Sequence, residues 1–186
     1  EVFDMTAVIQ EIGGVFGAQA ELEQKYFSQE VQFGPVNVSG DLQGLHQILN
    51  NILSNALKYT PAGGKISFLA RRDKDQNNRA YFSFVVQDTG CGMSEKFLEK
   101  IYTPFERDSR FGVPKVTGTG LGMTIVKSLV ERLDGTIHIS SKVDEGTCVI
   151  ISLPFILAQE QPKSQVKDAP KLKDFAGCRV LVADDN

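Results

Sequence analysis

Residues 42–58 carry the pattern that most restricts the fold, because their apolar side chains recur at three- and four-residue spacing. This spacing predicts one long amphipathic helix with a wide buried stripe. Pro61 and the pair Gly63-Gly64 end the pattern. The stripe consists of Leu45, Ile48, Leu49, Ile52, Leu53, Ala56 and Leu57.

The segments around this helix predict strands and further helices. The pattern of residues 65–71 and 80–87 predicts a β-hairpin, because polar and apolar residues alternate along the second segment. The order of segments predicts an α+β fold: a two-layer α/β sandwich with helices on one face of a mixed, mostly antiparallel sheet. Further strands are expected at 31–33, 36–38, 136–142 and 147–153, and further helices at 4–26 (with Asp4 as N-cap), 94–102 and 121–133.

Charge and composition exclude several classes of partner. A net charge of −3 gives no electrostatic reason to bind nucleic acid or an anionic membrane, and we expect neither. No apolar stretch is long enough for a membrane span, and no signal peptide opens the chain, so a cytoplasmic location is expected. The chain starts at Glu1 rather than Met, which indicates a piece of a longer protein and leaves a membrane anchor in that parent open. Three widely spaced cysteines, Cys91, Cys148 and Cys178, disfavour a zinc site and fit a reducing compartment.

The composition changes after Pro154. Residues 158–174 are polar, rich in Lys and interrupted by Pro, as in a linker. The apolar run CRVLVA then begins a new strand that is too short to be a domain. We therefore expect a domain at 1–156, a linker at 157–175 and the truncated start of a second domain at 176–186.

Three polar residues share one narrow face of the helix at 42–58. Asn51, Asn55 and Lys58 stand at i, i+4 and i+7, beside the apolar stripe rather than within it. Asn carbonyls suit Mg²⁺ when nucleotide phosphates supply its other ligands, and Lys58 can offset the negative charge. The plain alternative is two surface asparagines and a solvated lysine. Asn is unfavourable in the interior of a helix, so two of them one turn apart indicate a reason beyond helix formation.

Two glycine-rich stretches flank a charged segment. In DTGCGM (88–93), Gly90 and Gly92 allow a sharp turn and a close approach to a ligand, and Asp88 can accept a hydrogen bond from an amine such as that of adenine. The alternative is an Asx turn before a helix capped by Ser94. In GTGLG (118–122), glycines precede a helix, a combination that binds phosphate or else serves as a hinge. The segment 99–118 between them suits a lid over bound phosphate, or is simply a long surface loop.

Together these stretches resemble the catalytic, ATP-binding domain of sensor histidine kinases, in the superfamily that also includes gyrase, heat-shock chaperone ninety and the mismatch-repair clamp. The family's asparagine motif matches HQILNNILSNALKYT, its glycine motifs match DTGCGM and GTGLG, its phenylalanine motif matches IYTPFER, and its closing strand resembles EGTCVIISLP. The resemblance spans residues 3–155 and implies the Bergerat-type ATP-binding sandwich of that superfamily.

The resemblance also implies ATP and Mg²⁺ as ligands and assigns roles to matching positions. Asn51, Asn55, Lys58 and Arg107 are the implied catalytic residues, with Asn55 the magnesium ligand and Arg107 at the γ-phosphate. Phe105 would anchor the lid, and Val116-Thr117, where many members have a glycine, imply a stiffer hinge. The remaining implied ATP-binding residues are Tyr59 at the ribose, Asp88, Gly90, Gly92, Met93, Ile101 and Thr147 around the base, and Gly118, Thr119, Gly120, Leu121 and Gly122 at the phosphates.

Phosphoryl transfer from ATP to a histidine is the implied reaction, and the acceptor is expected outside this chain. His138 falls in a strand and His46 on a different side of its helix from Asn51, so neither has the family's acceptor context. A dimerisation domain of the same protein would carry the histidine. CRVLVADDN resembles the start of a receiver domain, with Asp184 and Asp185 as its acidic pair. We therefore expect a hybrid kinase of a two-component phosphorelay, with a receiver domain or response regulator as the next partner.

Two other functions compete with the kinase. Hydrolytic clamps of the superfamily have a Glu where Asn51 stands, and Asn cannot take a proton from water. A non-catalytic nucleotide sensor or docking module would bind ATP without transfer, but every phosphate-facing position is filled. Both observations favour the kinase.

Overall fold

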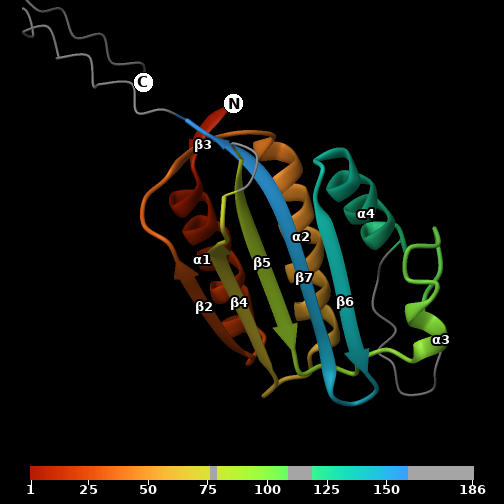
Figure 1. Cartoon of the computed structure of the whole chain (residues 1–186). Coiled ribbons are helices and arrows are strands. Elements are labelled where there is room, and N and C mark those ends of the chain that lie inside the picture. The colour runs from red at the N-terminus through yellow and green to blue at the C-terminus, as the bar shows by residue number, and fades with distance from the viewer. Residues whose placement is uncertain (76–78, 109–118, 159–186) are drawn as a thin grey trace, which may run out of the picture.

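The computed structural model describes residues 1–75, 79–108 and 119–158 (Figure 1). Gly118, the pair Val116-Thr117 and everything from residue 159 onward lie outside this range. The predicted linker, apart from its first two residues, and the predicted receiver start at 176–186 therefore stay predictions.

The described strands form one mixed sheet, and the helices pack against one face of it (Figure 1). The strand order is β1-β3-β7-β5-β4-β2, with β6 paired to β7. Among the described pairings only β2 with β4 is parallel, because α2 forms the crossover between them. This confirms the predicted α+β sandwich. The bounds are β1 Val2–Asp4, β2 Tyr26–Gln32, β3 Asn37–Ser39, β4 Lys65–Arg72, β5 Ala80–Asp88, β6 Thr136–Lys142 and β7 Gly146–Leu157.

Four helices are described: α1 Met5–Leu22, α2 Leu42–Tyr59, α3 Glu95–Leu98 and α4 Gly122–Arg132. Asp4 and Ser94 cap α1 and α3 as predicted, because their side chains accept hydrogen bonds from backbone N–H groups of the first turn. Within the described residues, no helix combines the length and the apolar character needed to cross a membrane.

The predicted stripe of α2 forms the centre of the core. All seven of its residues are at most 3% exposed. They face the sheet, whose inner surface carries Phe68 of β4 and Phe82 and Phe84 of β5, each at most 1% exposed. Burying one large apolar side chain stabilises the fold by about 1.5–3 kcal/mol, so this layer fixes the position of α2 and of every polar residue on it.

Several element bounds differ from the prediction. The strand predicted at 31–33 begins at Tyr26, so α1 ends at Leu22 instead of continuing to 26. Strand β1 was not predicted, since three residues carry no readable period. The helix predicted at 94–102 is only four residues long.

The last strand passes through Pro154 to Leu157 instead of ending at 153. On one side of β7, pairing with β6 ends at Ser152 and pairing with β3 begins at Ile156. Pro154 falls in the gap between these two partners, which is a position where a residue without an N–H is tolerated.

Candidate functional site

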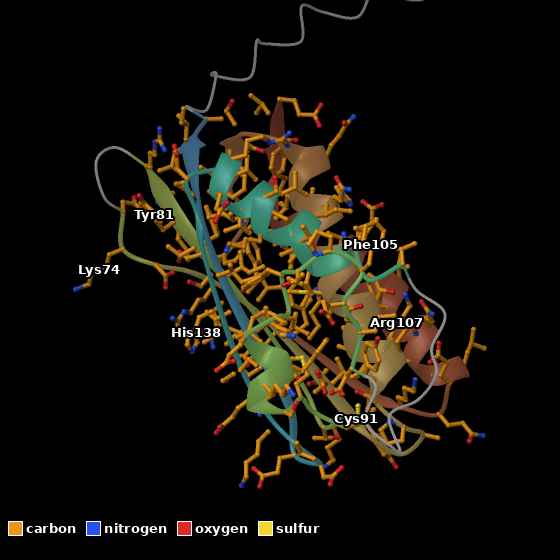
Figure 2. The ribbon with its side chains drawn as sticks, turned by 90° about the vertical axis from the view of Figure 1, so that its right-hand side faces the viewer. Lys74, Tyr81, Cys91, Phe105, Arg107 and His138 are labelled. Carbon is orange, nitrogen blue, oxygen red and sulfur yellow. The ribbon has the colours of Figure 1, made fainter. Side chains whose placement is uncertain are left out.

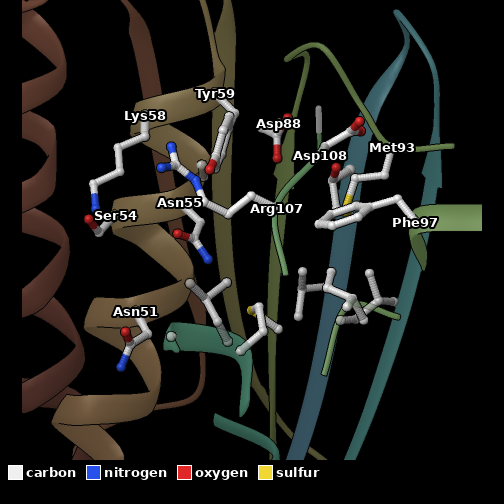
Figure 3. Close-up of a pocket in the computed structure, with 18 of the residues that line it drawn as sticks. Asn51, Ser54, Asn55, Lys58, Tyr59, Asp88, Met93, Phe97, Arg107 and Asp108 are labelled. Atoms are coloured by element: carbon white, nitrogen blue, oxygen red, sulfur yellow. The ribbon is translucent and has the colours of Figure 1, made fainter. Parts of the chain in front are cut away.

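A cavity of about 230 Å³ lies between α2, the end of β5, the start of β7 and the start of α4 (Figure 3). Most of the predicted ligand-binding residues line it, although they come from five separate stretches of sequence. Those at the cavity are Asn51, Asn55, Lys58, Tyr59, Asp88, Gly92, Met93, Ile101, Arg107, Thr119, Gly120, Gly122 and Thr147. Gly90, Phe105 and Leu121 are not among its lining residues, and Gly118 lies outside the described residues.

The amide side chains of α2 form one wall, as their helical spacing predicted. Asn51, Asn55 and Lys58 all line the cavity and come from successive turns of α2 (Figure 3). The Nδ2 group of Asn51 donates to the carbonyl oxygen of Gln47 at 2.8 Å, which fixes the side chain. Its Oδ1 faces the start of α4, where a Cβ added to Gly122 would lie 3.0 Å from it. The amide oxygen is therefore the atom that Asn51 offers at the junction of α2 and α4.

The opposite end of the cavity holds a buried carboxylate. Asp88 ends β5, is 8% exposed, and accepts a hydrogen bond from the Gly90 N–H at 2.8 Å. Burial raises the pKa of Asp88, and the backbone N–H groups of Gly90 and Thr147 offset part of that rise. The walls around it are apolar, with Val86, Met93 and Phe97 among them. Such a pocket suits a flat heteroaromatic group that carries an amine.

The turn after Asp88 is held against the hairpin that joins β6 and β7. Gly92 has a φ of +56°, and a Cβ there would lie 1.9 Å from the carbonyl oxygen of Lys142, so only glycine fits. The N–H of Met93 donates to the hydroxyl of Ser141 at 2.8 Å, and this hydroxyl also pairs with that of Thr147 at 2.9 Å. Ser141 thus positions two cavity residues.

The start of α4 supplies the third side of the cavity. Gly122 and Met123, its first two residues, line the cavity. Leu121 is the N-cap residue, and no side chain of the described residues caps the first turn. The N–H groups of an uncapped helix start carry partial positive charge and favour anions. This end of the cavity, with Lys58 of α2, is the one suited to phosphate.

Phe105 contacts the residues just before α4 through its backbone. Phe105 is 73% exposed, and residues 109–118 of the lid that it would anchor lie outside the described residues, so its anchoring role stays a prediction. The Phe105 N–H donates to the Gly120 carbonyl at 3.2 Å. Gly120 has a φ of +71°, and a Cβ there would lie 2.9 Å from the Phe105 backbone. Main-chain contact therefore joins Phe105, within the predicted lid, to Gly120, which follows that lid.

Tyr102 holds the same segment to α4. The Lys127 ammonium lies 4.8 Å from the centre of the Tyr102 ring, and the Thr124 hydroxyl donates to the Tyr102 carbonyl at 3.0 Å. Arg107 follows on the cavity side of the sheet, whereas exposed His138 of β6 lies on the opposite side of the molecule (Figure 2).

Several cavity residues were not predicted. Val86 and Val149 stand two positions from Asp88 and Thr147 on the same strands, and alternation places each pair on one face, which was the available signal. Ser54 lies three positions from Asn51 on α2 and could have been found by helical spacing. Ser141 does not line the cavity but contacts Met93 and Thr147, and it had no signal because this role depends on cross-strand register. The other additional lining residues are Ile52, Ala56, Cys91, Phe97, Glu106, Asp108, Met123 and Ile139.

The family model and similar known proteins point to the same family. Residues 40–157 match the family described as histidine kinase-, DNA gyrase B-, and HSP90-like ATPase. The autoinducer 2 sensor kinase/phosphatase LuxQ of Vibrio vulnificus is 36% identical over 144 residues, which cover 76% of this chain and 17% of that protein. The sensor histidine kinase WalK of Bacillus subtilis is 37% identical over 120 residues, which cover 64% of this chain and 19% of that protein. The chain thus spans less than a fifth of these relatives.

Solved structures agree with these relatives. The mycobacterial sensor histidine kinase MprB has a TM-score of 0.68 at 26% identity, with 85% of this chain and 100% of that chain covered. The full-length histidine kinase ShkA in complex with AMPPNP has a TM-score of 0.67 at 23% identity, covers 85% of this chain and 31% of that chain, and supports the fold alone. The chain belongs to the family of histidine kinase-, DNA gyrase B- and HSP90-like ATPases, and its relatives in that family are histidine kinases of two-component signalling.

Proposed function

We propose that this domain binds Mg-ATP in the cavity and donates the γ-phosphoryl group to a histidine on a separate dimerisation domain of the same protein. The observation that carries this proposal is the polarity of the cavity. Asp88 lies in apolar walls at one end, while amides, Lys58 and the uncapped start of α4 lie at the other. A nucleotide has the same polarity, with an apolar base that carries an amine at one end and phosphates at the other.

The base end would take adenine. The carboxylate of Asp88 can only accept hydrogen bonds when ionised, which fits the exocyclic amine of adenine. Met93 and Ile101 line the apolar surface on which the ring would rest, and the hydroxyl of Thr147 lies close to Asp88 in the register of β5 and β7. Tyr59, one residue after Lys58, would contact the ribose.

The phosphate end would take the triphosphate and its metal. Mg²⁺ prefers oxygen ligands and keeps several from phosphates and water, so the single amide oxygen of Asn55 fits as its protein ligand. When bound, the metal neutralises phosphate charge. Lys58 and the N–H groups at Gly120 and Gly122 would hold the remaining phosphate oxygens.

Arg107 would have to move when the nucleotide binds. Its side chain reaches across the cavity toward Asn55 and Tyr59 of α2 (Figure 3). The cavity of about 230 Å³ is smaller than the roughly 300–1,000 Å³ of typical ligand sites. We infer that bound ATP displaces the guanidinium toward the γ-phosphate, where its charge would stabilise the transferred group.

The reaction needs positioning and charge neutralisation more than covalent help from the protein. The attacking imidazole nitrogen supplies its own lone pair, and ADP leaves as the bond to the γ-phosphorus breaks. Asn51 is not a base, so water is not activated at that position. The phosphoryl group would then pass to a receiver domain or response regulator.

Transfer of labelled phosphate tests this function. The chain is mixed with γ-labelled ATP, Mg²⁺ and a separately produced dimerisation domain, with the His→Gln form of that domain as control. We expect label only on the histidine-bearing form. ATP binding without transfer would identify a sensor or docking module, and steady ATP hydrolysis without transfer would identify a clamp; either result overturns the proposal.

A further inference from the structure

Three polar side chains form one row across the sheet at the base end of the cavity. In the strand register, Thr147 of β7 lies opposite Asp88 of β5 on one side and opposite Ser141 of β6 on the other. Residues directly opposite each other on neighbouring strands present their side chains on the same face of a sheet. Figure 3 shows Asp88 at this end of the cavity, away from Asn51. Asp88 and Thr147 line the cavity, and Ser141 contacts Thr147 from beside it.

The hydrogen bonds of Ser141 set the direction of the Thr147 hydroxyl. The Ser141 oxygen accepts the N–H of Met93 at 2.8 Å. It also lies 2.9 Å from the Gly146 carbonyl oxygen and 2.9 Å from the Thr147 hydroxyl oxygen. A hydroxyl has one proton and a carbonyl oxygen can only accept, so the Ser141 proton goes to Gly146. The Thr147 hydroxyl then donates its own proton to Ser141, and its oxygen faces the cavity as an acceptor.

Backbone N–H groups beside this row are already used within the protein. Those of Gly90 and Thr147 donate to the carboxylate of Asp88. The N–H of Cys91 donates to the Tyr59 carbonyl at 3.2 Å. These groups are therefore taken and do not offer a donor to a carbonyl oxygen on a bound base. What the row presents to the cavity is two acceptors, the carboxylate of Asp88 and the hydroxyl oxygen of Thr147.

We propose that Ser141 is a positioning residue that makes Thr147 select a purine with an exocyclic amine over one with a carbonyl in its place. This inference rests on the proposed function and names a determinant of base specificity at the same site. The amine of adenine has two N–H bonds, so it donates both to Asp88 and to Thr147.

Inosine triphosphate shows why the direction of one hydroxyl matters. Its base carries a carbonyl oxygen where adenine has the amine. The neighbouring ring N–H of that base can still donate to Asp88, so the carboxylate alone does not reject it. The carbonyl oxygen, however, meets the Thr147 oxygen, and two buried acceptors that face each other are both left unpaired. Ser141 thus turns Thr147 into the group that discriminates between the two bases.

The variant Ser141→Ala removes the acceptor for the Thr147 proton. The hydroxyl is then free to turn and donate to a carbonyl, so the ratio of the affinities for ATP and inosine triphosphate falls roughly tenfold. Calorimetry with each nucleotide and Mg²⁺ measures this ratio, whereas a purely structural role would weaken both nucleotides alike. The matched control is Ser140→Ala, at the adjacent exposed position of β6, which leaves the ratio unchanged.

Thr147→Val gives a second measurement that does not depend on how well the Ser141 variant folds. It removes an acceptor, so binding of ATP weakens, the repulsion of inosine triphosphate is relieved, and the ratio falls. If Thr147 were a donor to the base, the ratio would rise instead. In the Thr147→Val background, Ser141→Ala changes the ratio no further, because the hydroxyl that it orients is gone.

The outcomes separate the inference from the proposed function. A wild-type ratio in Ser141→Ala, or a higher ratio in Thr147→Val, overturns the inference while ATP binding and phosphate transfer by the wild-type chain still stand. Absence of ATP binding by the wild-type chain defeats the proposed function, and the inference falls with it.

Discussion

Asp88 combines a role in recognition with a cost to stability. Its carboxyl group is 8% exposed at the end of β5, and burial raises its pKa. A carboxyl group whose pKa is higher in the folded than in the unfolded state contributes stability at acid pH, and this is lost as pH rises through the folded pKa. The ionised carboxylate therefore destabilises the ligand-free domain at neutral pH. The amine of a bound base would offset this destabilisation by donating a hydrogen bond to the carboxylate.

Asp88→Asn should separate stability from recognition. The amide oxygen can still accept the Gly90 N–H, and the desolvated charge is gone, so the ligand-free variant should melt above the wild type at neutral pH. The difference should shrink toward acid pH, where Asp88 is protonated. The preference for adenine over guanine nucleotides should weaken, because an amide can turn its donor toward the base. Thermal unfolding across pH and competition binding measure the two effects. A stabilisation independent of pH, or an unchanged adenine preference, would contradict this account.

Asn55→Ala should remove the magnesium-dependent part of ATP affinity. Loss of one amide oxygen next to a metal–phosphate complex should weaken binding by roughly tenfold to hundredfold. Calorimetry with Mg²⁺ and with a chelator isolates the effect, since the chelated affinities of variant and wild type should agree. Asn50→Ala, at an exposed position of the same helix that does not line the cavity, is the matched control. Equal affinities with Mg²⁺ would remove Asn55 as the metal ligand.

At the scale of elements, the last turn of α2 is fixed from outside the helix. The side chain of Lys25, 8% exposed, donates to the Leu57 carbonyl at 2.6 Å and pairs with Glu23 at 2.5 Å. Lys25 thus meets the negative end of the helix dipole. On the far side, the N–H of Cys91 donates to the Tyr59 carbonyl at 3.2 Å. Lys58 and Tyr59 are therefore held in position by two neighbouring turns, one that contains Lys25 and one that contains Cys91.

Lys25→Met should loosen this end of α2. The variant keeps the aliphatic stem and loses a charged hydrogen bond in a buried place, so it should destabilise the domain by about 1.5–3 kcal/mol and weaken ATP binding. Lys74→Met, at an exposed position, should stay within about 0.5 kcal/mol. Urea unfolding and calorimetry measure both.

The acid side of the stability curve gives a second check on this pair. The hydrogen bond from Lys25 lowers the pKa of Glu23, so Glu23 contributes stability above its unfolded pKa that is lost as pH falls through the folded pKa. That loss should be smaller in Lys25→Met. An unchanged acid slope would show that the pair does not act as described.

Elements with a strong local period were predictable, and those set by distant partners were not. The α2 stripe and β5 were correct because burial on one face imposes a period on the sequence. Residues 26–30 of β2 were missed, because the pairing of this strand with β4 decides its extent. The end of β7 was predicted too early because Pro154 indicated a stop. Pro154 is tolerated because it lies between the pairings of β7 with β6 and with β3, which only the sheet topology shows. At the site, most motif residues line the cavity, as their pattern indicated, but the place of Ser141 depends on cross-strand register.

At the scale of the whole molecule, the two ends of the described chain meet at one edge of the sheet (Figure 1). β1 pairs with β3, and β3 pairs with the last residues of β7. The rings of Phe3 and Phe82 both meet Phe155 edge-on, at 6.0 and 5.9 Å between centroids. Phe155 is 4% exposed, so residues beyond the predicted strand end at 153 belong to the core.

Truncation tests where the folded domain ends. A chain that stops at Ala158 keeps every described core residue and should unfold at the same temperature as the full chain. A chain that stops at Leu153 loses Phe155 and the pairing with β3. Removing a buried Phe side chain alone costs about 3–5 kcal/mol, or roughly 6–20 °C for a domain of this size. Phe155→Ala should reproduce most of this loss, while Ile156→Ala, 58% exposed, should have little effect. A lower melting temperature for the chain that stops at Ala158 would show that the predicted linker and receiver start take part in the fold, and the boundary at 156 would then be wrong.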